Sequence, residues 1–128
     1  MFSVDRSVAL PPLVLGGLRP LYRQMLRNGV HSASFEYLAP GAVLDVCVIA
    51  GAHGPEFNIR SREHGIDFTL AMTTHFRAVP VLDADTYRAL CEVIAPDAEP
   101  TPATIVDFLL RVVAQSPAVL SRTHACAA

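Results

Sequence analysis

Residues 52–76 read AHGPEFNIRSREHGIDFTLAMTTHF and contain the pattern that decides the fold. Within them, residues 56–63 (EFNIRSRE) and 66–74 (IDFTLAMTT) alternate apolar and polar side chains. A period of two is typical of β-strands, because successive side chains point to opposite faces of a sheet. The intervening His64–Gly65 dipeptide is a strong turn former. The stretch therefore predicts a β-hairpin.

Two more alternating segments lie upstream, at residues 32–38 (SASFEYL) and 42–50 (AVLDVCVIA). The turn-forming sequences APG at 39–41 and GAHGP at 51–55 separate them from each other and from the segment at 56–63. Consecutive strands joined by short turns pair as antiparallel neighbours. The four segments therefore predict an antiparallel β-meander.

Closing each hairpin at the centre of its turn predicts a register. In that register Glu36 lies opposite Asp45, Asp45 opposite Arg62, and Arg62 opposite Asp67. The apolar residues of all four strands then share one face: Ala33, Phe35, Tyr37, Leu44, Val46, Val48, Phe57, Ile59, Phe68, Leu70 and Met72. A slip of one residue would scatter this set over both faces, so the pattern supports this assignment of the faces.

The other predicted face mixes polar and apolar residues. Its second cross-strand row is Ser34, Cys47, Arg60 and Thr69, and Leu38, Val43, Ile49 and Ala71 lie around it. A solvated face would be more uniformly polar, so we expect this face to be partly covered. Its candidate binding residues are Glu36, Asp45, Cys47, Arg60, Arg62 and Asp67.

The residues before the sheet predict an extended, proline-containing arm over 1–16 and then a helix. This helix is expected from Arg19 to Asn28, because Pro20 is tolerated in a first turn and Gly29 supplies a stop. Its predicted apolar stripe is Leu18, Tyr22, Met25 and Leu26. Arg19, Arg23 and Arg27 recur along another face of the same helix.

Two further helices are expected after the sheet. Residues 75–82 are expected to form a bent continuation of the last strand or a short edge strand, since Pro80 cannot lie in a central strand. Asp83 or Asp85 then caps a helix whose predicted stripe is Tyr87, Leu90, Cys91 and Ile94. A last long helix opens at Thr101 and Pro102, with Ile105, Phe108, Leu109 and Val112 inward, Pro117 starting a short final turn and residues 123–128 frayed.

The length of 128 residues suits one compact domain over residues 1–128. Its expected class is α+β: an N-terminal helix, a four- to five-stranded antiparallel β-meander with helices packed on one face, and two C-terminal helices. The hydrophobic content of 52% and the charged content of 17% are high and low for a small monomer. They indicate apolar surface hidden in a homodimer or against a protein partner.

Composition also excludes several classes of function. The chain has no lysine, which excludes Schiff-base chemistry and the lysine of a phosphate loop. A net charge of −2 gives no overall field for nucleic acid, and no apolar run is long enough for a membrane span. Cys47, Cys91 and Cys126 lack the spacing of a disulfide framework or zinc knuckle, which indicates a reducing cytoplasm. No cofactor is expected.

Three histidines, His53, His64 and His75, recur every eleven residues. In a meander, His64 lies at the opposite turn from the other two, roughly 30 Å away at about 3.3 Å per residue. The spacing therefore reflects the period of the hairpins, and no metal site is predicted. A smaller set of His53, Glu56 and His75 is the geometric alternative.

Two groups suggest catalysis as an alternative to binding. The carboxylates of Glu36 and Asp45 could act as general acid and base, and Arg60 could activate the Cys47 thiol. The interpretation from residues alone is an ion-paired row and a space-filling cysteine, with no catalytic residue assigned. An anion or nucleic-acid binder acting through the arginines of the first helix is a further hypothesis.

The leading hypothesis is a small non-enzymatic binding or adaptor domain that acts as a homodimer through its sheet. A helix with a four-stranded antiparallel sheet is similar in architecture to the hotdog fold of thioesterases and dehydratases, although two more helices follow and no active-site motif of that family is present. The alternative hypothesis is therefore a small-molecule-binding or hotdog-like enzyme domain with a pocket between sheet and helices.

Overall fold

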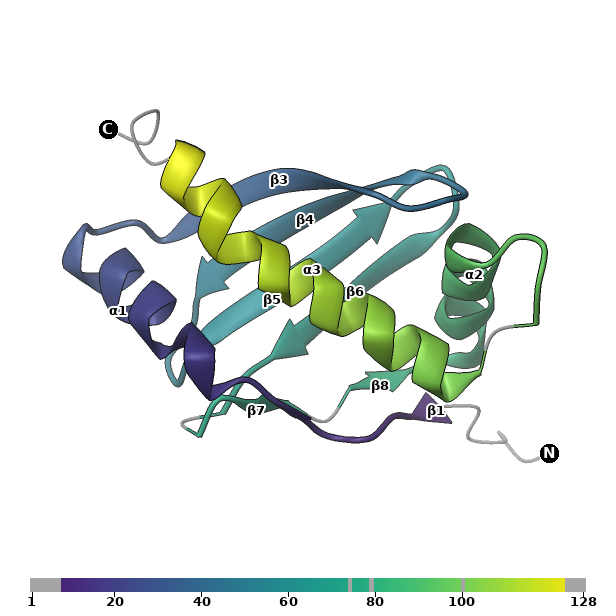
Figure 1. Cartoon of the computed structure of the whole chain (residues 1–128), viewed down its shortest axis with the longest axis horizontal. Helices are drawn as coiled ribbons and strands as arrows, with labels where there is room; N and C mark the ends of the chain where they lie inside the picture. The colour runs from purple at the N-terminus through teal and green to yellow at the C-terminus, as the bar shows by residue number, and fades with distance from the viewer. Residues whose placement is uncertain (1–7, 74, 79, 100, 124–128) are drawn as a thin grey trace, which may run out of the picture.

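A computed structural model of the chain describes residues 8–73, 75–78, 80–99 and 101–123. Its centre is a four-stranded antiparallel sheet in the order β3-β4-β5-β6 (Figure 1). The strands are β3 (Ser32–Leu38), β4 (Val43–Ala50), β5 (Pro55–Ser61) and β6 (Ile66–Ala71). The predicted α+β class and the predicted meander are thus confirmed.

The register of the first hairpin is as predicted, and the other two hairpins are shifted by two residues. Glu36 pairs with Asp45, but Asp45 pairs with Arg60, and Arg60 pairs with Asp67. The predicted pairings of Arg62 are therefore wrong. Because two residues is one full period of a strand, the shift leaves every side chain on its predicted face.

Both shifts arise from the lengths of the turns. In the second hairpin Ala50 pairs with Pro55, so the loop is Gly51–Gly54, closed by a 3.0 Å hydrogen bond from the Gly51 N–H to the Gly54 carbonyl. A Cβ on Gly51 would lie 2.8 Å from that oxygen, so glycine permits the closure. The two glycines bracket this turn, whereas the prediction placed its centre one residue too late.

In the third hairpin Ser61 pairs with Ile66, so Arg62–Gly65 form the loop. Gly65 is its last residue, with a φ of +68°, a left-handed conformation that suits glycine. The prediction had placed Gly65 in a two-residue turn. Arg62 is consequently an exposed loop residue, outside the cross-strand row.

One face of the sheet forms the core. Leu44, Val48 and Phe57 have no exposed surface, and Val46 and Ile59 are 1% exposed. The long helix α3 (Pro102–Thr123) crosses the sheet (Figure 1). Its residues Ile105, Phe108, Leu109 and Val112 are buried, as predicted, and the Phe108 ring packs edge-on against Tyr37 with centroids 5.4 Å apart.

The end of α3 differs from the prediction, because Pro117 lies inside the helix and does not begin a new turn. Pro117 has no backbone N–H, so it offers no hydrogen bond to the Val113 carbonyl one turn earlier. The preceding residue, Ser116, is fully buried and donates its hydroxyl to the Val112 carbonyl at 3.3 Å. Of the tail predicted to fray, Thr123 ends α3 and 124–128 lie outside the described residues.

The first helix, α1 (Arg19–Arg27), follows a short 3₁₀ turn, η1 (Gly16–Leu18). Leu18 and Met25 are buried as predicted, but the stripe also contains Leu21, whereas Leu26 is 56% exposed. The buried face is thus rotated from the predicted one. Tyr22 is half-buried, and its hydroxyl donates to the Gly51 carbonyl, which ties α1 to the turn between β4 and β5.

Helix α2 (Ala84–Ile94) begins after Asp83, whose side chain makes no capping hydrogen bond. Leu90 and Cys91 are buried as predicted, together with Thr86 and Val93, while Tyr87 and Ile94 are half-buried. The helix packs against β6. The Gly41 N–H, in the turn between β3 and β4, donates to the Val93 carbonyl at 2.7 Å.

Of the predicted N-terminal arm, residues 8–16 are part of the fold and residues 1–7 lie outside the described residues. Its strands β1 (Val8–Ala9) and β2 (Leu13–Val14) pair antiparallel with β8 (Val81–Leu82) and β7 (Arg77–Ala78). Residues 75–82 were expected to extend the sheet, but their described part forms these two ribbons instead of a fifth strand. Among the described residues, no helix is long and apolar enough to cross a membrane.

Candidate functional site

The second face of the sheet, called here the open face, consists of the side chains that point away from the core. They are Ser32, Ser34, Glu36, Leu38, Val43, Asp45, Cys47, Ile49, Glu56, Asn58, Arg60, Asp67, Thr69 and Ala71, all of them half-buried or exposed. A shallow hollow of about 710 Å³ lies on this face. The described part of a single chain does not cover this face, although partial cover was expected.

The structure brings five of the six predicted binding residues together on the open face. One cross-strand row is Glu36, Asp45, Arg60 and Asp67, and the next is Ser34, Cys47, Asn58 and Thr69. Arg60 therefore lies opposite Asp45. The predicted position of Arg60 opposite Cys47 is wrong. The sixth predicted residue, Arg62, lies in the loop after β5.

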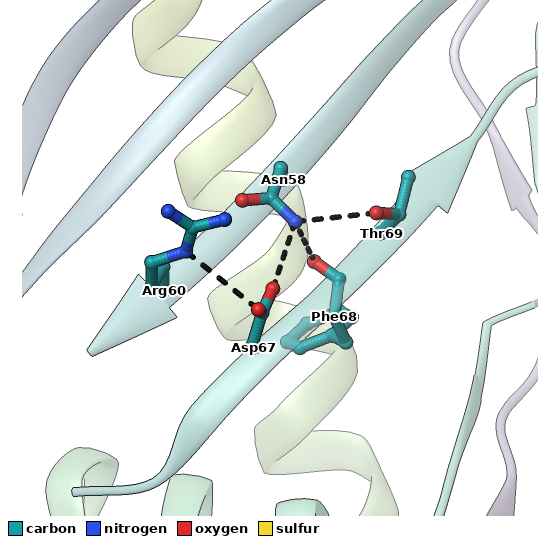
Figure 2. A network of polar contacts seen from close by, with 5 residues as sticks. All are labelled: Asn58, Arg60, Asp67, Phe68 and Thr69. Atoms are coloured by element: carbon teal, nitrogen blue, oxygen red, sulfur yellow. Dashed lines mark hydrogen bonds and ion pairs between the residues drawn. The ribbon is translucent and has the colours of Figure 1, made fainter. Parts of the chain in front are cut away.

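Asn58 is the centre of a polar network that the prediction missed (Figure 2). Its side-chain nitrogen lies 3.1 Å from an Asp67 carboxylate oxygen, 3.2 Å from the Phe68 carbonyl and 3.2 Å from the Thr69 hydroxyl. The Arg60 guanidinium lies 3.7 Å from Asp67. Asn58 occupies a polar position in the alternation of β5, which is the sequence signal that places it on this face.

The open face carries more negative than positive charge. Among the described residues, its carboxylates belong to Glu36, Asp45, Glu56 and Asp67, and its one cation is Arg60, which pairs with Asp67. Glu36 and Asp45 are direct cross-strand neighbours and form no ion pair with any described residue. Like charges directly opposite each other are unfavourable, so this position would gain from an external cation.

The apolar side chains of the open face lie at the two ends of β4. Leu38 is 77% exposed and its cross-strand neighbour Val43 is 47% exposed. Ile49, at the other end of β4, is half-buried. The face therefore offers apolar contact at two corners and charge between them.

The open face has little of what a catalytic site needs. Glu36 and Asp45 are both exposed, and their hollow is open to solvent. The neighbour of Cys47 on β5 is Asn58, whose side chain supplies neither a base nor a cation. Cys91 lies on the buried side of α2, and burial raises the pKa of its thiol, which keeps the thiol protonated and unreactive.

The histidines lie at opposite ends of the sheet. His53 is in the loop between β4 and β5, and His64 is in the loop between β5 and β6. His53 and Glu56 line one hollow together with Ala52, Ala71, Met72 and Thr73, but His75 is not among the lining residues. In the part of the chain that is described, no three His, Cys, Asp or Glu side chains cluster as metal ligands would.

One hollow does lie between the sheet and the helices, where the alternative hypothesis places a pocket. It measures about 210 Å³ and is lined by Tyr37, Ala39, Pro40, Ile94, Thr104, Asp107, Phe108 and Arg111. Pockets for small molecules are usually about 300–1,000 Å³.

The arginines of α1 are exposed, and Arg19 lies over the Phe76 ring at 5.5 Å from its centroid.

No family model matches this chain, and neither the curated proteins nor the solved structures contain a match to it.

Proposed function

We propose that this chain is a non-enzymatic binding or adaptor domain of the cytoplasm that acts as a homodimer through its sheet. It binds a basic segment of a protein partner on the open face. The observation that carries this proposal is the contrast between the two faces, because one is covered by α3 and the other presents carboxylates and exposed apolar side chains to solvent.

The chemistry of the open face favours a partner that carries both arginine or lysine and apolar side chains. Glu36 and Asp45 would receive the basic groups, since neither is paired within the described part of the chain. Leu38 and Val43 would pack against the apolar ones. A surface of this kind supports recognition of a peptide or protein, in which a few buried contacts supply affinity and charges supply specificity.

The alternative, a small-molecule-binding or hotdog-like enzyme domain, is supported only by the hollow beside Tyr37 and Phe108. That hollow contains one carboxylate, Asp107, which is paired with Arg111 at 2.9 Å. A carboxylate paired in this way is a poor general base, so we place the alternative second.

The test is a fluorescence-anisotropy titration with a labelled eight-residue peptide that alternates arginine and valine. Saturable binding that weakens with added salt is expected, because exposed charges are screened over about 10 Å at 0.1 M salt. The double variant Glu36→Gln with Asp45→Asn should weaken binding about tenfold, since each lost ion pair is worth up to about 1 kcal/mol.

The matched control is Asp97→Asn with Glu99→Gln, which removes the same charge from the exposed segment after α2. This control should bind the peptide as the native chain does. Equal losses in both double variants would mean that only net charge attracts the peptide. That result, or no saturable binding at all, would contradict the proposal.

A further inference from the structure

The two edges of the sheet are in different surroundings. In the described part of the chain, β3 is the outermost strand on one side, with β4 as its single neighbour in the sheet (Figure 1). At the other edge, helix α2 packs against β6. An edge strand presents a row of unpaired backbone N–H and C=O groups, which is a template for another strand.

The hydrogen bonds of the first hairpin identify the groups that β3 leaves free. The His31 carbonyl accepts from the Ala50 N–H at 2.9 Å, and the Ala39 N–H donates to the Ala42 carbonyl at 2.9 Å. Hydrogen-bonded pairs alternate along an antiparallel ladder, so the odd-numbered residues of β3 bond to β4. The N–H and C=O groups of Ser32, Ser34, Glu36 and Leu38 therefore point away from the sheet.

The edge also lacks the usual devices that prevent pairing. Proteins protect edge strands with proline, lysine, bulges or very short strands. β3 is seven residues long, has an unbroken pairing with β4, and contains one charged residue, Glu36. A strand of this length and composition can accept a second strand along its whole edge.

We propose that β3 pairs antiparallel with β3 of a second copy, about a twofold axis at Phe35, so that the two sheets become one continuous sheet. The proposal rests on the homodimer of the proposed function and specifies its contact. It places the open faces of the two copies side by side on the same surface of the joined sheet.

The register follows from the free groups and the charges. Pairing through the even-numbered residues allows twofold axes at residues 34, 35 or 36. An axis at 36 would put Glu36 opposite its own copy, which is unfavourable. An axis at 34 would leave Tyr37 and Leu38 opposite residues that precede the strand. The axis at 35 pairs all seven residues of β3 and puts Ser34 opposite Glu36 of the second copy.

The side chains on the core side fit this register. Phe35 would meet its own copy, and aromatic cross-strand pairs stabilise a sheet. Tyr37 would lie opposite Ala33 of the second copy, so that a large side chain faces a small, half-buried one. Each copy makes the same contacts, as a twofold interface requires.

Charge decides between this arrangement and a stack of two open faces. Stacking would bring Glu36, Asp45 and Glu56 of one copy against the same carboxylates of the other, with Arg60 already paired to Asp67. Pairing through β3 avoids that repulsion and leaves both open faces free for a partner. The second copy therefore belongs at the edge.

The first test measures dimer dissociation by sedimentation equilibrium in Ser34→Pro and Thr69→Pro chains. Ser34 and Thr69 lie at the two ends of the same cross-strand row, one on each edge strand of the sheet. The N–H of Thr69 points away from the sheet, as that of Ser34 does. This follows because the Met72 N–H donates to the Pro55 carbonyl, so the even-numbered residues of β6 bond to β5. Ser34→Pro should raise the dissociation constant at least about tenfold, and Thr69→Pro should leave it unchanged. A native chain that is monomeric throughout the micromolar range would overturn the proposal.

The second test keeps the backbone intact and does not depend on how the proline variants fold. Ser34→Glu would face Glu36 of the second copy twice in each dimer and should weaken it about two- to thirtyfold. Adding Glu36→Arg should restore the native dissociation constant, because the new glutamate then faces an arginine. Weakening without rescue, or an equal loss in a Thr69→Glu control, would overturn the register.

Amide hydrogen exchange separates this proposal from the proposed function. In the dimer, the amides of Ser32, Ser34, Glu36 and Leu38 should exchange slowly, and dilution to monomer should release them. A dimer in which these four amides exchange freely would show association through another surface. In that case the edge pairing is wrong, while peptide binding on the open face still stands and the homodimer contact lies elsewhere.

Discussion

The two faces of the sheet are formed by the same strands, but their side chains differ in how far they are exposed to solvent. On β4, Val46 is 1% exposed on the core face, whereas Val43 is 47% exposed on the open face. Both are valines in regular strand geometry, so the residue type and the backbone are the same. The difference is that α3 crosses one face and leaves the other uncovered, so the contribution of each side chain depends on its cover.

The largest effect is expected at the centre of the core face. Phe57 on β5 has no exposed surface, and Phe57→Ala should lower the free energy of unfolding by about 3–5 kcal/mol, because it removes apolar contacts and leaves a cavity. Urea denaturation followed by circular dichroism measures this change. A loss below about 1 kcal/mol would mean that the core face is not packed as described.

A matched pair of valines on one strand sharpens the comparison. Val46→Ala should cost about 2 kcal/mol, and Val43→Ala less than about 0.5 kcal/mol, because only the first valine is removed from water by the helix. Both variants should be measured by the same denaturation at low protein concentration. Equal costs at the two positions would show that the open face is also covered.

The smallest effect is expected for the ion pair of the open face. The Arg60 and Asp67 side chains are 53% and 60% exposed, so Arg60→Ala should change the free energy of unfolding by about 0–1 kcal/mol. A buried pair would cost about 3 kcal/mol or more when broken. A loss of that size that grows with protein concentration would indicate stacked open faces, and would contradict pairing through β3.

Parity was the strongest information in the sequence. The alternation in residues 32–38, 42–50, 56–63 and 66–74 assigned each side chain to its face, and the burial of Leu44, Val48, Phe57 and Leu70 confirms it. Five of the six predicted binding residues, all except Arg62, lie on the open face for the same reason. Parity is robust because exchanging the faces would expose the whole apolar set.

The register was less well determined by the sequence, because a shift by two residues leaves every side chain on the same face of the sheet. The predicted partner of Asp45 was Arg62, and the structure has Arg60. The choice depends on where each loop closes, and in two loops the glycines stand at the ends and not at the centre. Short-range sequence thus fixes the face of a residue more firmly than its opposite neighbour.

The sequence by itself determined the four strands of the central sheet with their approximate bounds, the two faces and the three helices, because these follow from local periodicity and turn chemistry. Tertiary structure alone decided that the N-terminal arm pairs with β7 and β8, that Leu21 and not Leu26 of α1 is buried, and that α3 continues through Pro117. Each of these depends on contacts between residues far apart in the chain, whose strength no local pattern records. The exposure of the open face was also decided by the tertiary structure, since it depends on where the helices pack.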